Sequence, residues 1–461
     1  MKLNKNQLLH LFNRTSYGIP FGDLKTMEGN STGEVIKKLI KEDHFNAYFN
    51  IIPTPEISPQ EIKMLSEVEK KMLNEMAMDK LQKLNVHWVK YMISEKSFPN
   101  LFREKMAVFW HGHFACRERN PYLAQKYLNT IRKHALGNFK DLLFEVSKEP
   151  AMLKFLNNQQ NKKQSPNENF AREVMELFTL GRGNYSEEDI KNAARAFTGW
   201  GFNKNGEFVI RKKQHDESQK NFLGQKGNFN GDDILEIILK QKETANFISR
   251  KVYQHFVSEH VDENHLKELS DYFYESHYDI ALLMEKILKS EWFYEERNKG
   301  NLIKSPIDFL VQFMKTYHVE FDSEESYLIL QKMLGQTLLY PPNVAGWPGG
   351  KTWIDSSTLM LRLRIPEVIL SSGELKEEEF KFPQGMKPKG KFKKLAAQVD
   401  WDAFLQEFEE VKDKDLQNEI SEYLIPNALP KGFLPEYSGD RNKTFKASAF
   451  LLTQLPDFQL C

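Results

Sequence analysis

Two histidines flank a single glycine in the segment FWHGHF, residues 109–114. The preceding residues NLFREKMAVFW predict a helix capped by Asn100, with His111 in its last turn and Gly112 as its end. His113 would then lie in extended chain, which would decide whether both imidazoles can reach one ion. Neutral imidazoles are ligands for zinc, copper, nickel or iron. A histidine beside aromatic residues is equally a packing residue, and the spacing leaves both interpretations open.

A second polar set lies in NENFAREVMELFTLG, residues 167–181, where Ser165-Pro166 predicts a helix start. A turn of about 100° per residue puts the apolar side chains on one arc and the polar ones on the other. The polar arc holds Asn169, Arg172, Glu173 and Glu176. Glu173 and Glu176, one turn apart, could bind a cation or divide acid and base roles, with Arg172 paired to Glu176. The alternative is a surface helix with a solvated ion pair.

Short strands joined by glycine and asparagine turns are predicted over residues 200–230. At the end of this ribbon stands His215-Asp216, a natural position for presenting polar groups. A third metal ligand could come from His215, Asp216, Glu173 or Glu176, and Asp216 is also a candidate catalytic acid or base. The alternative is an Asx-type turn that opens the following loop.

The segment YPPNVAGWPGGKTW, residues 340–353, predicts an ordered surface loop. We expect Trp347, Lys351 and Trp353 to contact a substrate from the rim of a cleft. GWPGGKT is not a phosphate-binding loop, because Ala345 stands where such a loop requires glycine. The chain also has no G-x-S-x-G serine nucleophile motif.

Composition limits the classes of function. The 461 residues carry 64 basic and 64 acidic side chains, so no global charge favours nucleic acid or an anionic membrane. Two cysteines, Cys116 and Cys461, exclude a disulfide framework and a four-cysteine zinc site. The apolar piece LLHLF is too short for a signal peptide, and no stretch approaches the roughly 20 apolar residues of a transmembrane helix. We expect a cytoplasmic protein.

The dominant patterns are helical, and they predict a mostly α protein with a small β-ribbon insertion near residues 200–230. Ser186 and Ser305, each followed three residues later by aspartate, predict two further helix starts. We expect a main helical domain over residues 1–380 and a basic linker or loop over 381–400. Helices over 401–461 would pack back on the main domain.

Read together, the motifs resemble the domain-of-unknown-function family 1800 of bacteria. The resemblance rests on HLFNRTSYG (10–18), EKMAVFWHGHF (104–114), NENFAREVMELFTLG (167–181), DIKNAARAFTGW (189–200), HDESQKNFLG (215–224), NLIKSPIDFLV (301–311), LLYPPNVAGWPGGKTWI (338–354) and the ending LPDFQL. The family name implies no reaction. Its polar segments point to the histidines and acidic residues above and also to Asn167, Glu168 and Arg195. Many members look exported, which is the alternative location.

Two functional hypotheses follow. The first is a hydrolase-like enzyme in which His111, His113 and His215 hold a divalent metal and a nearby glutamate acts as general base. Its substrate would be a small molecule, a peptide or a glycan, and Asn169 and Arg195 would help to bind it. The second is a non-catalytic binding or assembly protein, in which the same residues hold helices together and Trp347 and Trp353 mark a partner surface.

Overall fold

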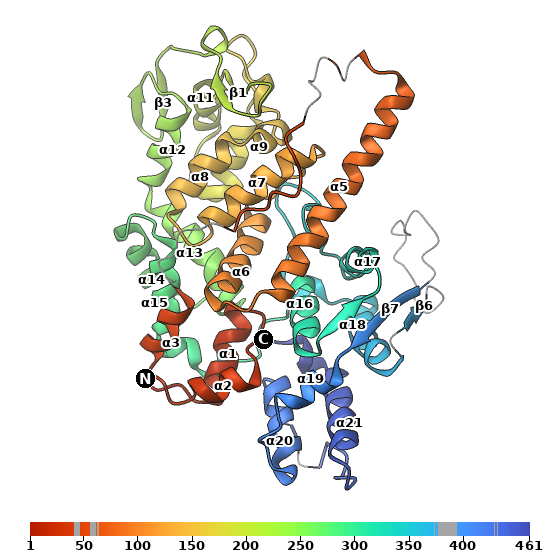
Figure 1. Ribbon diagram of the computed structural model, residues 1–461. Helices are drawn as coiled ribbons and strands as arrows, with labels where there is room; N and C mark the ends of the chain where they lie inside the picture. The colour runs from red at the N-terminus through yellow and green to blue at the C-terminus, as the bar shows by residue number, and fades with distance from the viewer. Residues whose placement is uncertain are drawn as a thin grey trace.

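The computed structural model describes residues 1–40, 47–55, 61, 64–372, 374–376, 394–427, 429–430 and 432–461. It is mostly α-helical with small sheets, so the predicted fold class is confirmed (Figure 1). The helices of the first third of the chain are α1 (Lys5–Thr15), α2 (Phe21–Met27), α3 (Thr32–Leu39), α5 (Glu67–Ser94), α6 (Phe98–His113), α7 (Pro121–His134), α8 (Phe139–Lys148) and α9 (Pro150–Phe155).

The middle of the chain is helical except for two hairpins. Its helices are η1 (Asn158–Gln160), α10 (Asn169–Glu173), η2 (Val174–Thr179), α11 (Glu187–Ala196), η3 (Lys212–Gln214), α12 (Gly231–Leu239), α13 (Lys242–Phe256), α14 (Glu263–Glu275), α15 (Ile280–Lys289), η4 (Glu291–Tyr294) and η5 (Glu296–Asn298). The last part contains α16 (Pro306–Thr316), α17 (Glu325–Leu334), η6 (Gly350–Trp353), α18 (Ser356–Ser372), α19 (Trp401–Gln406), α20 (Asp413–Leu424), α21 (Arg441–Thr453) and η8 (Pro456–Gln459).

The predicted ribbon consists of two antiparallel hairpins. β1 (Trp200–Phe202) pairs with β2 (Phe208–Ile210), and β3 (Lys220–Phe222) pairs with β4 (Gln225–Gly227). A three-stranded sheet that the sequence did not predict has the order β5 (Val319–Phe321), β7 (Lys394–Val399), β6 (Glu374–Lys376). Of the expected basic linker, residues 381–393 lie outside the described residues, and Lys394–Val399 is the strand β7.

Local capping chemistry accounts for several helix starts. The Ser186 and Ser305 side chains each accept a hydrogen bond from the backbone of the aspartate three residues on, and both capping boxes are formed as predicted. The predicted cap at Ser165 is wrong. Ser165 forms an isolated bridge with Lys162, so the helix begins only at Asn169. α6 begins at Phe98, before the predicted cap at Asn100, because Pro99 fits its first turn.

A buried ion pair holds α6 against its neighbours in the centre of the molecule (Figure 1). Glu104 of α6 lies 2.7 Å from Nη2 of Arg132 on α7, and the Trp88 indole of α5 donates to the same carboxylate at 2.7 Å. All three side chains are buried, so each polar group depends on the others. These bonds tie α6 to both α5 and α7.

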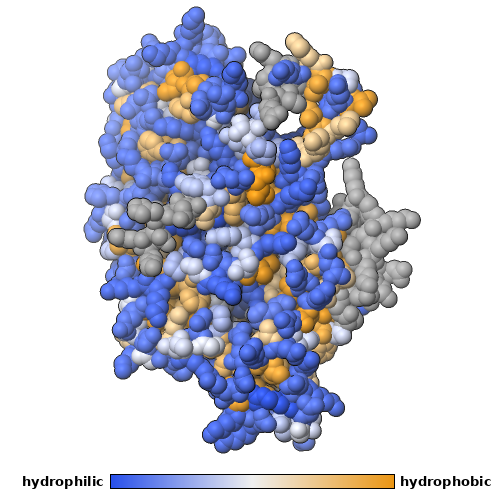
Figure 2. All heavy atoms as spheres, in the orientation of Figure 1, coloured by the Kyte–Doolittle hydropathy of each residue, from blue (hydrophilic) through white to orange (hydrophobic). Residues whose placement is uncertain are grey.

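The face of the molecule in Figure 2 is mostly hydrophilic. Hydrophobic side chains gather at the outer end of α5, where Met64, Val68, Met72 and Met76 are exposed at or near its start (Figure 2). Across the part of the chain that is described, no helix combines the length and the apolar composition required to cross a membrane.

Candidate functional site

The two histidines of FWHGHF lie on one helix. α6 continues through Gly112 to His113, so the prediction that Gly112 ends the helix is wrong. Residues two apart on a helix are separated by about 200°, and the imidazoles therefore point to different sides. The geometry excludes the arrangement in extended chain that would have let both rings face one ion.

His111 is a packing and hydrogen-bonding residue. Its Nε2 accepts a hydrogen bond of 3.0 Å from the backbone N–H of Leu339, and its ring lies between Trp88 and Trp347, with centroids 5.6 and 5.5 Å away. Burial lowers the pKa of His111 to about 4. The imidazole is therefore neutral at pH 7. Its Nε2 is occupied by Leu339, the residue before the 340–353 loop, while its Nδ1 is buried without a hydrogen-bond partner among the described residues.

His113 faces η2 instead. Its Nε2 lies 3.0 Å from the carbonyl oxygen of Phe178, to which it donates, and its Nδ1 is buried without a hydrogen-bond partner. Burial, with a contribution from the nearby Lys251 ammonium, holds the pKa of His113 well below its usual range. His113 thus places an unused acceptor beside a lysine.

The glycines of the two motifs allow close contact between them. Gly346 has φ +78°, and a Cβ on it would stand 2.1 Å from the Gly112 carbonyl oxygen. A Cβ on Gly112 would in turn stand 3.8 Å from the Trp347 ring. Glycine is required at position 346 because backbone meets backbone there. This contact seats the 340–353 loop on α6.

The segment 167–181 contains a π-helix, η2, in which Leu180 N–H bonds the Met175 carbonyl five residues back at 2.9 Å. Such a widened turn leaves carbonyl groups for other partners. Leu177 and Phe178 supply them: the Lys251 ammonium lies 3.4 Å from the Leu177 carbonyl oxygen, and His113 takes that of Phe178. η2 therefore connects the 167–181 segment to α6 and α13 through its backbone.

The polar face of this segment is paired outward. The predicted pair between Arg172 and Glu176 is not formed. Arg172 instead donates to Glu187 at 2.8 and 2.9 Å, with Glu168 as a weaker partner. Glu176 accepts from Arg182 at 2.6 Å and from the Tyr185 hydroxyl at 3.0 Å, which lowers its pKa. Arg172 therefore pairs with Glu187 of α11, and Glu176 pairs with Arg182.

Glu173 makes no hydrogen bond or ion pair among the described residues, and partial burial together with Glu176 raises its pKa. The Asn169 amide donates to the Leu156 carbonyl at 3.1 Å. Both residues thus join the polar surface that Arg172 and Glu176 form.

A separate network lies at the ribbon. Arg195 Nε donates to Asp216 at 2.8 Å, and hydrogen bonds from Arg195 and Ser218 hold the pKa of Asp216 well below its usual range. His215 Nδ1 donates to the Thr198 carbonyl at 2.8 Å, and the Asp216 N–H donates to the Thr198 hydroxyl at 2.8 Å. These bonds shape the chain between β2 and β3, as the Asx-type alternative predicts.

The predicted metal ligands do not come together. Within the residues that the structure describes, no three His, Cys, Asp or Glu side chains are placed to hold one ion. His111 and His113 point apart, and His215 belongs to the ribbon network. The expectation of one hollow shared by all predicted residues is therefore wrong in its geometry.

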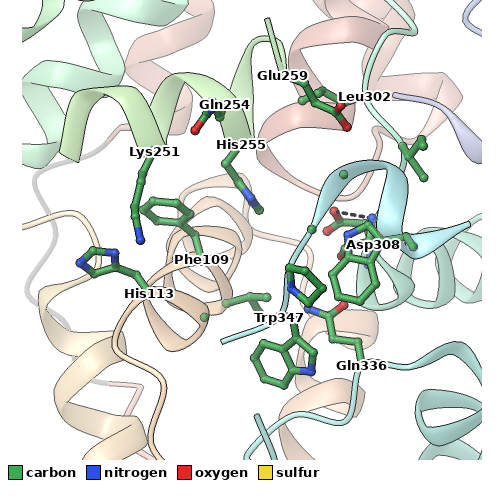
Figure 3. A pocket seen from close by; sticks show the side chains of 18 of the residues that line it. Phe109, His113, Lys251, Gln254, His255, Glu259, Leu302, Asp308, Gln336 and Trp347 are labelled. Carbon is green, nitrogen blue, oxygen red and sulfur yellow. Dashed lines mark hydrogen bonds between the residues drawn. The ribbon is translucent and has the colours of Figure 1, made fainter. Parts of the chain in front are cut away.

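A different cavity lies beside α6. It has a volume of about 570 Å³ and is enclosed by α6, α13, the start of α16 and the 340–353 loop; we call it the central pocket (Figure 3). Four of the residues predicted from sequence line it: His113, Trp347, Lys351 and Trp353. The other titratable side chains in its wall are Arg14, Lys105, Lys251, His255, Glu259, Asp308 and Cys461.

Lys251 and His255, one turn apart on α13, extend toward α6 (Figure 3). Burial lowers the pKa of Lys251 to about 8 and that of His255 to about 4. The Phe109 ring lies between the imidazoles of His255 and His113, with centroids 5.0 and 6.4 Å away. At pH 7 the lysine is mostly protonated and the imidazole is neutral.

The opposite wall is formed by a salt bridge. Lys105 of α6 lies 2.7 Å from the Asp308 carboxylate of α16, and both side chains are largely buried. Lys105 lowers the pKa of Asp308 against the opposing effect of burial. Arg14 of α1 stands close by, so helices distant in sequence meet here.

Sequence reasoning missed Arg14, Lys105, Lys251, His255 and Asp308. Three of them stand inside motifs that carry the family resemblance: HLFNRTSYG, EKMAVFWHGHF and NLIKSPIDFLV. Lys251 and His255 also carried a signal, since two titratable residues one turn apart interrupt the apolar pattern of TANFISRKVYQHFV. Four of the resemblance motifs, those that begin at residues 10, 104, 301 and 338, converge on the central pocket.

The protein is therefore a mostly helical one in which four of the resemblance motifs form a polar pocket. The chain belongs to the family DUF1800, described as a protein of unknown function, whose sequence profile matches residues 10–460. Neither curated proteins nor solved structures gave a match.

Proposed function

We propose that the protein is an enzyme whose active site is the central pocket, with Lys251 as general acid and His255 as general base. The observation that carries the proposal is that a proton donor, Lys251, and a proton acceptor, His255, lie one turn apart on α13 and both line the pocket. With pKa values of about 8 and about 4, the Lys251 ammonium can donate a proton at pH 7 and the neutral His255 can accept one.

The surroundings support this assignment. The pocket is large enough for a small polar molecule, and both apolar and polar side chains line it. Trp347 is half-buried in the loop and lines the pocket, Trp353 is largely buried beside it, and Lys351 is exposed at the rim. Hydrolysis of a polar small molecule is the simplest reaction that an acid and a base of this kind serve.

The predicted metal chemistry is not part of this proposal, which uses the side chains of the pocket themselves. Arg172, Glu176, Arg195 and Asp216 are assigned a structural role in it, and Glu173, which lies outside the central pocket, is given no role. Each of the pairs that they form ties one segment of the chain to another.

The test is substrate depletion in a mixture of small metabolites, followed by mass spectrometry. Wild-type protein is expected to consume one compound catalytically, and Lys251→Met and His255→Gln to reduce its rate at least 100-fold, in line with acid–base contributions of about 10²–10⁴. Glu176→Gln, outside the pocket, should keep the wild-type rate. Equal rates in all three variants would reject the assignment.

A binding or assembly protein is the second candidate. The hydrogen bonds of His111 and His215 to backbone groups favour it, because such bonds hold elements together without chemistry. Retention of one compound by the protein without its conversion would support this alternative.

A further inference from the structure

Four cationic side chains are buried together at the Asp308 end of the central pocket. Arg14 of α1, Lys105 of α6, Lys304 just before α16 and Arg362 of α18 are between 0% and 4% exposed. Lysine and arginine are almost never buried to this degree without matching acceptors. The segments that supply them are far apart in sequence, so the fold has gathered them.

The two arginines have donors to spare. Arg14 uses Nη2 for the Asn298 carbonyl at 2.9 Å and the Asn301 amide oxygen at 2.6 Å, while its Nε and Nη1 are buried without a partner. Arg362 donates through Nη1 to the Lys304 carbonyl at 3.0 Å, and its Nε and Nη2 have no partner. Arg14 lines the central pocket, so this arginine contributes buried donors to the pocket wall.

Negative charge at this end is scarce. The Asp308 carboxylate already binds Lys105 at 2.7 Å, and it also interacts with Arg14, Lys304 and Arg362. The Cys461 side chain lies near enough to Arg14 and Lys304 to interact with both electrostatically. Glu259 belongs to the loop side of the pocket, where its carboxylate lies against Gly350. Among the described residues, the four buried cations therefore outnumber the side-chain carboxylates that act on them.

We infer that the central pocket binds a ligand with an anionic group, a carboxylate or a phosphate, whose oxygens accept hydrogen bonds from Arg14 beside the Lys105–Asp308 pair. This inference rests on the proposed function, since it names the class of substrate for the same pocket. The anionic group would hold one end of the ligand, and the rest would extend toward Lys251 and His255. Charged hydrogen bonds from arginine to such oxygens are among the strongest available in a protein.

The experiment titrates the ligand-free protein with sodium phosphate and, separately, with sodium succinate. Sodium chloride keeps the ionic strength constant, and calorimetry and thermal unfolding are the readouts. We expect saturable binding of at least one anion and a rise in Tm. Saturation by phosphate alone or by succinate alone would support the inference and identify the group. No saturable binding of either anion would overturn it.

Variants assign the site. Arg14→Met should raise Kd for the bound anion at least 10-fold, and Arg14→Lys should raise it less, because a lysine keeps the charge but offers fewer donors. Arg250→Met is the control, since Arg250 pairs with Glu263 on the surface. Unchanged affinity in both Arg14 variants would contradict the inference. If Arg14→Met does not fold, the Nε–H NMR signal of Arg14 in the wild type, assigned through Arg14→Lys, must shift on anion binding.

The two proposals can fail separately. Arg14-dependent anion binding without any catalytic effect of Lys251→Met would support the anion site and reject the proposed enzyme function. Loss of turnover in Lys251→Met, together with no anion binding by the wild type, would support the enzyme function and reject the anion site.

Discussion

The Gly112 carbonyl oxygen occupies the space in which a side chain on Gly346 would begin, only 2.1 Å from that Cβ position. The 340–353 loop is thus seated on α6 through a contact that only glycine permits. Because Trp347 follows Gly346 directly and lies 5.5 Å from His111, the same contact sets one wall of the central pocket.

Gly346→Ala is expected to destabilise the protein by at least about 2 kcal/mol, because it adds a backbone clash to the cost of positive φ. Gly335→Ala is the matched control. Gly335 has φ +87°, but no atom lies within 4 Å of its Cβ position, so only the conformational cost of about 1 kcal/mol applies. Urea unfolding of both variants measures the difference. Equal losses would contradict the close contact.

Lys105→Met should cost about 3–5 kcal/mol of unfolding free energy, because it leaves the Asp308 carboxylate buried without its partner. Adding Asp308→Asn to this variant should restore part of the loss, since the uncompensated charge is then gone. Lys90→Met, which removes an exposed pair with Glu324 at 3.3 Å, should cost less than about 1 kcal/mol. A double variant no more stable than Lys105→Met would count against a buried ion pair.

The neutral state of His111 predicts a loss of stability in acid. Its pKa falls from 6.5 in the unfolded chain to about 4 in the folded one, so the unfolded state binds more protons between these values. Stability from this group is complete above about pH 6.5 and declines as pH falls toward 4, by about 3 kcal/mol in total. His111→Gln should reduce the slope of unfolding free energy against pH over this window, while His113 and His255, whose pKa values burial also lowers, keep their contributions. An unchanged slope would show that His111 is not the group responsible.

Lys251 should titrate well below the ordinary lysine value of 10.5, since burial lowers its pKa to about 8. Protein labelled with ¹³C at the lysine ε carbon gives a direct measurement by NMR, and Lys251→Arg identifies the signal. If Lys251 is the general acid, turnover must decline above about pH 8 as the ammonium loses its proton. A titration near pH 10 would remove Lys251 from that role.

Sequence patterns predicted what depends on neighbours along the chain. The mostly α fold, the ribbon over 200–230 and the caps at Ser186 and Ser305 all arise from residues a few positions apart. The error at Gly112 has a nonlocal cause. Glycine ordinarily ends a helix, but here the helix continues, and Gly112 lies against Gly346, more than 200 residues away.

The candidate site was only partly predictable for the same reason. Helical periodicity tells which side chains share a face, but it does not tell which other element meets that face. His113, Trp347, Lys351 and Trp353 were predicted site residues because their local motifs are unusual. Arg14 and Asp308 become neighbours only when α1 and α16 pack together, and no spacing within either segment reveals that.

The contacts of Lys251 and His113 depend on the number of residues in the π-helix η2. Deleting one residue between Val174 and Thr179 would return this turn to ordinary four-residue bonding and rotate everything after it by about 100°. The carbonyl groups of Leu177 and Phe178 would then turn back into their own helix. Lys251 would lose its contact with the Leu177 carbonyl group and His113 its contact with that of Phe178, although no side chain of the central pocket had been altered.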